Sequence, residues 1–139
     1  MWIVSKYNST SAKDVCYNCD SQVAKHSYSY FRAAKYRSAD KVMCKIWHDG
    51  ELPVALYFAI KCRRHARLIE IAVRSEYKHR GIGRMVLFDL LSEIKQCGIT
   101  KLTFRTPMNE PAKDFWLHMG ATIMDVKGND YEMGINIKD

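Results

Sequence analysis

Two glycines stand in the middle of the chain, between an apolar run and an amphipathic stretch. Residues 78–83 read Lys-His-Arg-Gly-Ile-Gly, and they follow residues 68–73, which are apolar except for Glu70. A glycine loop that leads from a strand into a helix presents unpaired backbone N–H groups at the helix N-terminus, where negative charge is favoured. The basic side chains in and beside this loop add positive charge at the same place. The pattern therefore predicts a phosphate-binding loop, with a pyrophosphate as its natural ligand.

The residues that follow this loop argue against two familiar nucleotide-binding motifs. The P-loop of nucleoside triphosphatases ends in Gly-Lys-Ser/Thr, whereas Gly83 is followed by Arg84 and Met85. The dinucleotide fingerprint needs a third glycine and an acidic residue about twenty positions later. The next apolar segment ends instead in Phe-Arg-Thr at residues 104–106. We therefore expect neither a P-loop NTPase nor a Rossmann dehydrogenase.

The segments before the glycine loop predict helices followed by a hairpin. Residues 11–37 mix apolar and basic side chains without strand-like alternation, which indicates one or two helices, and Ser11 with Asp14 resembles a capping box. Residues 42–47 and 53–62 are rich in β-branched and aromatic side chains, and an Asp-Gly pair between them supplies a turn signal. Residues 42–47 and 53–62 are therefore predicted to form the two strands of a β-hairpin.

The glycine loop itself connects a predicted strand to a predicted helix. Residues 68–73 suit a central strand that is covered on both faces. Four apolar residues then recur at helical spacing before a stop at Gly98, namely Leu87, Leu90, Leu91 and Ile94. Residues 99–105 read as the next strand. A strand, loop, helix and strand in this order predict two parallel strands.

The end of the chain predicts a short helix and a closing hairpin. Asn109 is a suitable N-cap for a last helix of about three turns, which Gly120 would end. Residues 121–127 and 131–137 then read as two strands around a Gly-Asn-Asp turn. We expect these last two strands to be antiparallel.

Two motifs resemble those of the GNAT family of N-acetyltransferases. Its acetyl-CoA-binding motif is [Q/R]-x-x-G-x-[G/A] after an apolar strand, and Lys78, Gly81 and Gly83 occupy its defined positions. A second family motif resembles the stretch from Asn109 to Gly120, which carries an alanine and a Phe-Trp pair. The resemblance covers about residues 40–137. It implies one acetyltransferase domain over residues 1–139, with a mixed α/β fold: a twisted, mostly antiparallel sheet with one splayed parallel strand pair, flanked by helices.

The resemblance also implies a set of residues that bind acetyl-CoA, the acyl donor of the family. Strand residues would line the pantetheine arm, the loop backbone would hold the pyrophosphate, Asn109 would hydrogen-bond the arm, and Trp116 would lie near the sulfur. The implied strand residues are Ile71, Ala72 and Val73. The implied loop residues are His79, Arg80, Gly81, Ile82, Gly83 and Arg84.

The reaction that the resemblance implies is direct transfer of an acetyl group to a primary amine in a ternary complex. Such a reaction needs a base, and Glu70 alternates with Ile69 and Ile71, so we expect it on the opposite face, toward the amine. The alternative is an ion pair between Glu70 and Arg67 or Arg63. A different class of protein also stays open, namely a non-catalytic module that binds acyl-CoA or nucleic acid and retains the fold.

The sequence departs from the family pattern where a general acid is expected. Many members carry a tyrosine at the position of Trp116, whose indole cannot serve as an ordinary proton donor to the leaving thiolate. Water, His118 or Tyr131 are the alternatives, so the general acid and the acyl-chain preference stay open. The family branch that acetylates ribosomal-protein N-termini carries a glutamate where this sequence has Phe104, which argues against that particular base.

Composition narrows the class of protein further. The 139 residues suit one globular unit, and no apolar run is long enough to cross a bilayer. Five cysteines without an export signal predict reduced thiols and a cytoplasmic location. Cys16 and Cys19 lack a second ligand pair, so we expect no metal site and interpret them as two small side chains that share one helix face.

The formal net charge of +7 favours an anionic partner. Residues 61–67 are the densest basic cluster, which suggests either guidance of tRNA, DNA or an acidic protein, or simply a solvated loop. Residues 25–37 mix tyrosines with basic residues and suit either base stacking or helix packing. The acceptor stays open between a small amine, a protein amine and charged tRNA, and so does the oligomeric state, with a homodimer as one option.

Overall fold

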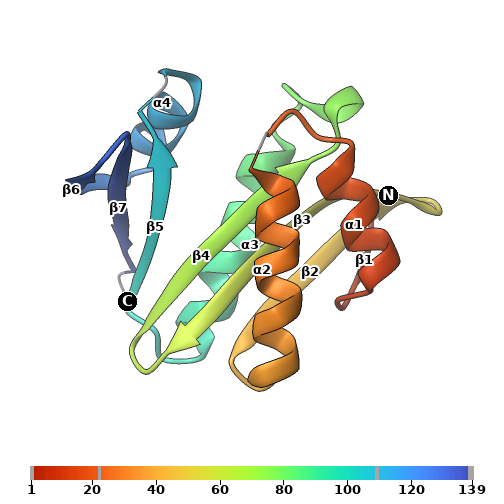
Figure 1. Ribbon diagram of the computed structural model, residues 1–139, viewed down its shortest axis with the longest axis horizontal. Coiled ribbons are helices and arrows are strands. Elements are labelled where there is room, and N and C mark those ends of the chain that lie inside the picture. Colours follow the sequence, from red (N-terminus) through yellow and green to blue (C-terminus); the bar gives the residue numbers. More distant parts are fainter. Residues whose placement is uncertain (1, 22, 109, 138–139) are drawn as a thin grey trace.

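The computed structural model describes residues 2–21, 23–108 and 110–137, excluding the side chain of residue 110 (Figure 1). One sheet runs through these residues, with the strand order β1-β2-β3-β4-β5-β7-β6. The strands are β1 (Trp2–Ser5), β2 (Val42–Asp49), β3 (Leu52–Cys62), β4 (His65–Val73), β5 (Lys101–Pro107), β6 (Thr122–Lys127) and β7 (Asp130–Asn136).

Strands β4 and β5 are the parallel pair, and every other pairing of the sheet is antiparallel. Their register joins only residues 65–67 of β4 to residues 101–103 of β5. Beyond that point the two strands separate, and Figure 1 shows them parting toward the ends at Val73 and Pro107. The sheet is therefore split over half of its length between its two central strands.

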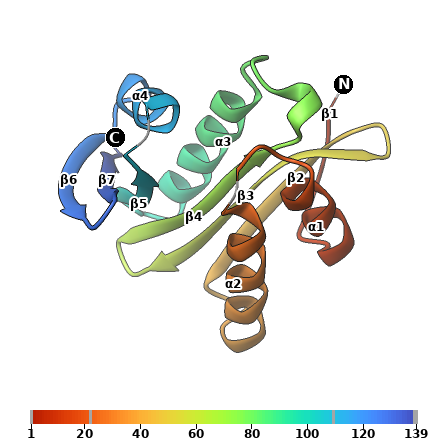
Figure 2. The same cartoon turned by 45° about the horizontal axis from the view of Figure 1, so that its top comes forward.

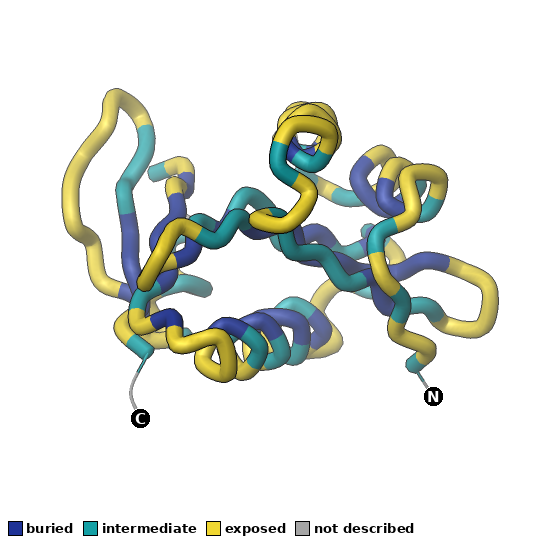
Figure 3. Tube along the Cα trace, turned by 90° about the horizontal axis from the view of Figure 1, so that it is seen from below, coloured by how far each residue is buried: buried dark blue, intermediate teal, exposed yellow. Residues whose placement is uncertain are grey.

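Helices cover both faces of the sheet (Figures 2 and 3). Helices α1 (Ser9–Tyr17) and α2 (Ala24–Arg37) pack on one face, and α3 (Ile82–Gln96) packs on the other. A short 3₁₀ helix, η1 (Ser75–Tyr77), precedes the glycine loop, and α4 (Glu110–His118) lies against β5. The sheet thus has two separate apolar cores.

The helices contribute their apolar faces to these cores, α3 to one and both α1 and α2 to the other. On the α3 face, Leu87, Leu90 and Ile94 are fully buried, as their helical spacing predicts. On the other face, Phe31 of α2 stacks on Phe58 of β3 with ring centroids 4.4 Å apart. These contacts fix α2 and α3 on opposite sides of the split sheet.

The order of elements matches the sequence prediction except at the N-terminus. Two helices, the first hairpin, the strand-loop-helix-strand unit with its parallel strands and the closing hairpin are all confirmed. Strand β1 was not predicted, because it has only four residues and two of them are exposed. The predicted N-cap Asn109 lies outside the described residues.

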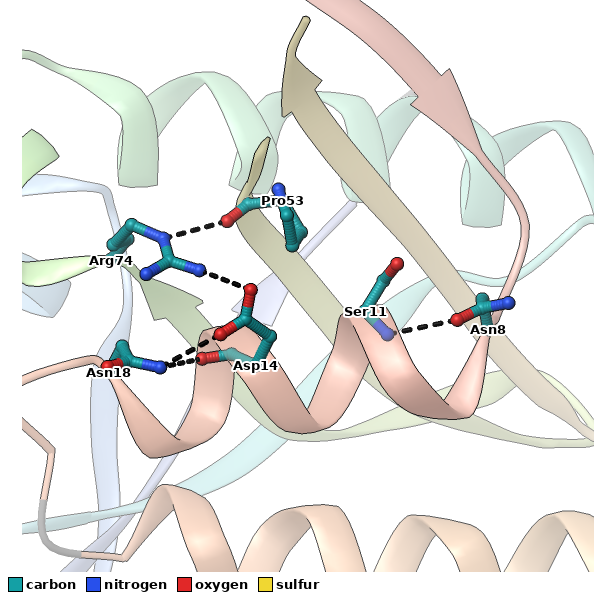
Figure 4. Close-up of polar contacts among 6 residues, drawn as sticks. All are labelled: Asn8, Ser11, Asp14, Asn18, Pro53 and Arg74. Atoms are coloured by element: carbon teal, nitrogen blue, oxygen red, sulfur yellow. Dashed lines mark hydrogen bonds and ion pairs between the residues drawn. The ribbon is translucent and has the colours of Figure 1, made fainter. Parts of the chain in front are cut away.

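The predicted capping box at the start of the first helix is wrong. The N-cap of α1 is Asn8, three residues before Ser11. The side chain of Asn8 accepts a hydrogen bond of 2.9 Å from the backbone N–H of Ser11. Asp14 instead accepts a bond of 2.6 Å from Arg74, whose Nε donates to the carbonyl of Pro53 (Figure 4). Asp14 therefore anchors α1 to the sheet.

The two nearby cysteines do not share a helix face. Cys16 is buried within α1, whereas Cys19 lies beyond the helix end and bridges to Arg74. Burial raises the pKa of both thiols, so neither is poised as a thiolate. Within the described ranges, no cluster of three histidine, cysteine or acidic residues could hold a metal ion. None of the described helices is long and apolar enough to cross a membrane.

Candidate active site

A cavity of about 820 Å³ fills the gap where β4 and β5 part. Its walls come from the diverging halves of both strands, from α4, and from the loop between α1 and α2. Its lining includes Cys19, Asp20, Ser21, Val23 and Ser27 on the helical side, Glu70, Ile71, Ala72, Val73, Lys78 and Gly83 along β4 and the glycine loop, and Phe104, Arg105, Phe115 and Trp116 on the far wall. The walls of the cavity therefore include residues from elements on both faces of the sheet.

A bulge in β4 turns Glu70 toward α2. Glu70 pairs with Phe58 and Leu68 pairs with Ala59, so Ile69 is an extra residue in the ladder. As a result Ile69 packs on the same core as α1 and α2, while Ile71 packs on the α3 core. The expectation that Glu70 faces away from Ile71 fits this packing, but strict alternation with Ile69 fails because of the bulge.

Glu70 is held by one hydrogen bond and by no ion pair in the described part of the chain. Its Oε1 accepts a bond of 2.8 Å from the hydroxyl of Ser27. Burial raises the pKa of the carboxyl to about 7, and the Ser27 hydrogen bond acts in the lowering direction. Arg67, one of the expected ion-pair partners, instead forms an ion pair with Glu132 and donates a hydrogen bond of 3.3 Å to the hydroxyl of Thr103. Glu70 is thus a half-buried acid whose pKa is raised to about 7.

The glycine loop adopts the backbone that a phosphate site needs. Gly81, the N-cap of α3, has a φ of +76°, and His79 has a φ of +64°. No side chain caps this helix start, so its first N–H groups have no side-chain acceptor. Arg80 and Arg84 stack on Tyr77 and Phe88, with cation-to-centroid distances of 4.9 and 5.3 Å. The loop therefore offers unsatisfied donors next to docked guanidinium groups.

Gly83 lies inside α3, where it lines the cavity. A Cβ atom built there would lie 3.9 Å from Phe115 and 4.0 Å from Val73, which are ordinary contacts. Any longer side chain would extend into the space between these two residues. On its other side, the loop borders a second hollow of about 360 Å³, lined by residues that include Arg80, Gly81 and Ile82.

Aromatic side chains close the far wall of the cavity. The ring of Trp116 lies 4.0 Å from that of Phe104 and 5.1 Å from that of Phe115, measured between centroids. His118 and Tyr131, the candidate proton donors, do not line the cavity. The arrangement supplies shape at this end and no obvious acid.

Half of the predicted site residues meet at the cavity. Glu70, Ile71, Ala72, Val73, Gly83 and Trp116 line it. Arg80, Gly81 and Ile82 line the second hollow, while His79 and Arg84 line neither. Asn109 lies outside the described residues.

Sequence reasoning missed the wall that α2 and the α1–α2 loop contribute. Ser27 shares a helical face with three buried residues of α2. Counted from buried Ala24, Ser27 stands three positions later, and buried Tyr28 and Phe31 stand four and seven positions later. A polar residue within a buried apolar stripe was the available signal. Asp20, in the α1–α2 loop, forms an ion pair with Lys78 and accepts a hydrogen bond of 2.6 Å from the hydroxyl of Ser75. It therefore connects the α1–α2 loop to the segment that contains the glycine loop.

Comparisons with known proteins place the chain in a family. Residues 13–121 match the profile described as the acetyltransferase (GNAT) family, and a search of curated protein sequences finds no match. The chain belongs to the GNAT family of acetyltransferases. Acetyl-CoA is the acyl donor of this family, as the motifs predicted.

Solved structures share the fold at low sequence identity. The PaiA N-acetyltransferase of Thermoplasma acidophilum, in complex with coenzyme A, has 14% identity and a TM-score of 0.81 over 98% of this chain and 99% of that chain. The ribosomal-protein-S18-alanine N-acetyltransferase of Escherichia coli has 15% identity and a TM-score of 0.81 over 100% and 96%. A GNAT-family acetyltransferase of Staphylococcus aureus has 12% identity and a TM-score of 0.78 over 99% and 100%. These likenesses concern the fold.

Proposed function

We propose that this protein is an N-acetyltransferase that transfers an acetyl group from acetyl-CoA to a primary amine by direct attack in a ternary complex. The observation that carries the proposal is Glu70, a half-buried carboxyl with a pKa of about 7 in the wall of a cavity between splayed strands. A general base works best when its pKa lies near the operating pH. We further propose that residues 1–139 form a single domain.

Two features of the site support the binding of acetyl-CoA. Beyond residue 67, β4 has no partner strand on the β5 side, so its backbone groups near Ile71 and Val73 are free to pair with an extended pantetheine arm. The N–H groups that follow Gly81 suit a pyrophosphate. When bound, acetyl-CoA supplies a thioester whose acyl carbon accepts the amine and whose thiolate departs.

Glu70 would take the proton that the acceptor amine must lose. The carboxyl faces the side of the cavity formed by Ser27 and the α1–α2 loop, so we place the acceptor on that side. Ser27 would hold the carboxylate in one orientation and lower the cost of ionising it. The base and the wall around the acceptor would therefore come from different elements.

Trp116 would shape the acyl end of the cavity rather than move a proton. Its indole has a single N–H donor and no acidic proton, and its ring packs on Phe104. A thiol has a reference pKa of about 8.5, so the leaving group can depart as a thiolate and take its proton from water. We assign no side chain as general acid.

The first experiment separates binding from turnover. Acetyl-CoA at 100 times its dissociation constant should stabilise the folded protein by about 2.7 kcal/mol, read as a rise in melting temperature. Release of the free CoA thiol would then be followed with a panel of primary amines. In Glu70→Gln, turnover should fall about 10²- to 10⁴-fold while the acetyl-CoA-dependent shift is unchanged.

Glu76→Gln is the matched control, because Glu76 is an exposed acid six residues away, outside the cavity. Equal turnover in Glu70→Gln and the wild-type protein would contradict the role of Glu70. A thermal shift without thiol release for any amine would favour the alternative of a non-catalytic acyl-CoA-binding module, for which the tryptophan at position 116 is the motivating observation.

A further inference from the structure

A further hollow, separate from the cavity and from the hollow beside the glycine loop, lies at the other end of β4, where the β3–β4 hairpin turns. Its volume is about 920 Å³. We call it the basic groove after the basic residues that line it: Lys41, Lys61, Arg63, Arg64, His65 and Lys101. Its remaining described lining residues are Ile60, Cys62 and Thr100, so none of the described acids lines it. The basic groove and the cavity share no lining residue.

The cations of the basic groove have no acidic partners among the described residues. Elsewhere in these residues, Lys45, Arg67, Arg74 and Lys78 each form an ion pair with an aspartate or glutamate. The five lysines and arginines of the groove form none. Clustered cations that are not neutralised within the protein create a positive field that attracts a polyanion.

The hairpin turn carries arginine where the backbone favours glycine. Arg63 has a φ of +54°, in the left-handed region that glycine and asparagine occupy most easily. An arginine at this position strains the turn slightly and places a guanidinium at its tip, next to Arg64. A side chain kept at a conformational cost indicates a role outside the folding of the hairpin.

An exposed aromatic residue lies at the end of α2, five positions before Lys41 of the groove. Tyr36 is 93% exposed, and α2 ends with the next residue, Arg37. The chain then turns through a hydrogen bond of 3.0 Å from Lys41 N–H to the carbonyl of Ser38, and Lys41 already lines the groove. In Figure 1 the C-terminal end of α2 lies at the same end of the sheet as the β3–β4 turn.

The structure divides the basic and aromatic stretch of α2 into two parts. Tyr28 and Phe31 are buried in the core, which accounts for them as packing residues. Tyr30 and Tyr36 are exposed, and nothing in the fold explains the nearly complete exposure of Tyr36. An exposed ring and a cluster of cations at the same end of the sheet match the surface that single-stranded nucleic acids use, where bases stack on aromatic rings and phosphates meet arginine and lysine.

We propose that the basic groove and Tyr36 together bind single-stranded RNA. Arginine forks match phosphate geometry, and the exposed ring gives an unpaired base a stacking partner that an acidic peptide would not use. The inference does not rest on the proposed acetyl transfer, because it concerns a different surface. RNA in the groove also leaves the glycine loop free, so it does not compete with acetyl-CoA.

The test is fluorescence anisotropy of a short labelled single-stranded RNA, titrated with the full-length protein at several salt concentrations. For single strands the slope of log affinity against log salt is about −0.7 per neutralised phosphate. The double variant Arg63→Gly/Arg64→Gln should bind more weakly, and its slope should be shallower by about 1.4. Glycine suits the turn, so this variant keeps the hairpin and loses only the two charges.

The control variant Lys6→Gln/Lys127→Gln removes the same net charge from outside the groove and should keep the affinity and slope of the wild-type protein. Tyr36→Ala should bind RNA at least about fivefold more weakly, with an unchanged slope. Saturating acetyl-CoA should not displace the RNA. The proposal is wrong if both charge variants lose affinity equally, if acetyl-CoA displaces the RNA, or if polyglutamate competes as well as RNA while Tyr36→Ala binds normally.

Discussion

Ser27 and Glu70 join helix α2 to the bulge of β4 through a hydrogen bond of 2.8 Å, although 43 positions separate them in the chain. The serine is the one hydrogen-bond donor that the described residues offer this carboxyl. It stabilises the charged form, whereas the surrounding burial stabilises the neutral form. The balance between these two effects sets the pH at which Glu70 becomes a base.

Replacing Ser27 by alanine should move that balance toward the neutral carboxyl. Without the hydrogen bond the pKa of Glu70 rises above its present value of about 7, by about 1 to 2 units. The pH profile of acetyl transfer should shift toward higher pH, with little change in acetyl-CoA affinity. Ser29→Ala is the control, because Ser29 is exposed on the same helix. Identical profiles for all three proteins would remove Ser27 from the site.

Glu70 should also make the stability of the fold depend on pH. Its pKa is about 7 in the folded protein and near the ordinary 4.5 in the unfolded chain, so the folded state holds an extra proton between these values. The stabilising contribution is complete below pH 4.5 and is lost as the pH rises through 7. Glu70→Gln removes this dependence and should gain roughly 2 kcal/mol at pH 8.

Urea unfolding at pH 5 and pH 8 measures this difference. The wild-type protein should lose stability between the two values relative to Glu70→Gln, whose amide stays neutral. Glu76→Gln, the exposed-acid control, should follow the wild-type curve. Parallel stability curves for wild type and Glu70→Gln would show that Glu70 is ionised normally in the fold.

Gly83 offers a test of the cofactor side that is independent of catalysis. A Cβ there meets only ordinary contacts with Phe115 and Val73, and the family motif itself allows alanine at this position, so Gly83→Ala should fold and bind acetyl-CoA. Gly83→Leu should fold but fill the space between those side chains, and we expect its acetyl-CoA-dependent thermal shift to fall by at least half. An undiminished shift in the leucine variant would place the cofactor elsewhere.

The elements with repeating signals were predictable from sequence. The stripe through Leu87, Leu90 and Ile94 indicated α3 and its buried face, because three or four residues at helical spacing can bury only one side. The turn residues marked both hairpins, and the strand order around the glycine loop implied the parallel pair. These signals are local, and so they survive without tertiary information.

Features that depend on register or distant contacts were not predictable. Alternation placed Ile69 opposite Glu70, but the extra residue in the ladder of β4 cannot be read from a run of apolar side chains. Asn8 and Ser11 are both residues that cap helices, so sequence alone could not choose between them. The partner of Glu70 depends on how α2 docks, and only the folded chain brings Ser27 to it.

Replacing Arg63 by glycine should stabilise the hairpin while it weakens RNA binding. The left-handed φ of +54° costs a non-glycine residue about 1 kcal/mol, so Arg63→Gly should gain up to that amount in urea unfolding. Arg64 has no positive φ, so Arg64→Gly should gain nothing. A loss of stability in Arg63→Gly would mean that the arginine packs against the fold and is not kept for a ligand.

Two ion pairs are formed by residues that precede Gly81 in the chain, and they should differ sharply in their contribution to stability. Arg74 is buried and donates a hydrogen bond of 2.9 Å to the carbonyl of Pro53 and another of 2.6 Å to the carboxylate of Asp14. These bonds connect α1 to β3 (Figure 4). Arg74→Met leaves both acceptors without this donor and should cost about 2 to 3 kcal/mol. Lys78 and Asp20 are both more than half exposed, so Lys78→Met should leave the unfolding curve almost unchanged.

Urea unfolding of the two variants compares the pairs directly, since each substitution removes one cation and keeps an unbranched apolar side chain. The thermal shift with acetyl-CoA adds a second readout, because Lys78 lines the cavity and Arg74 does not. We expect Lys78→Met to weaken acetyl-CoA binding at nearly normal stability, and Arg74→Met to lose stability first. Equal stabilities would mean that packing of the α1 core, rather than the buried arginine, holds α1 in place.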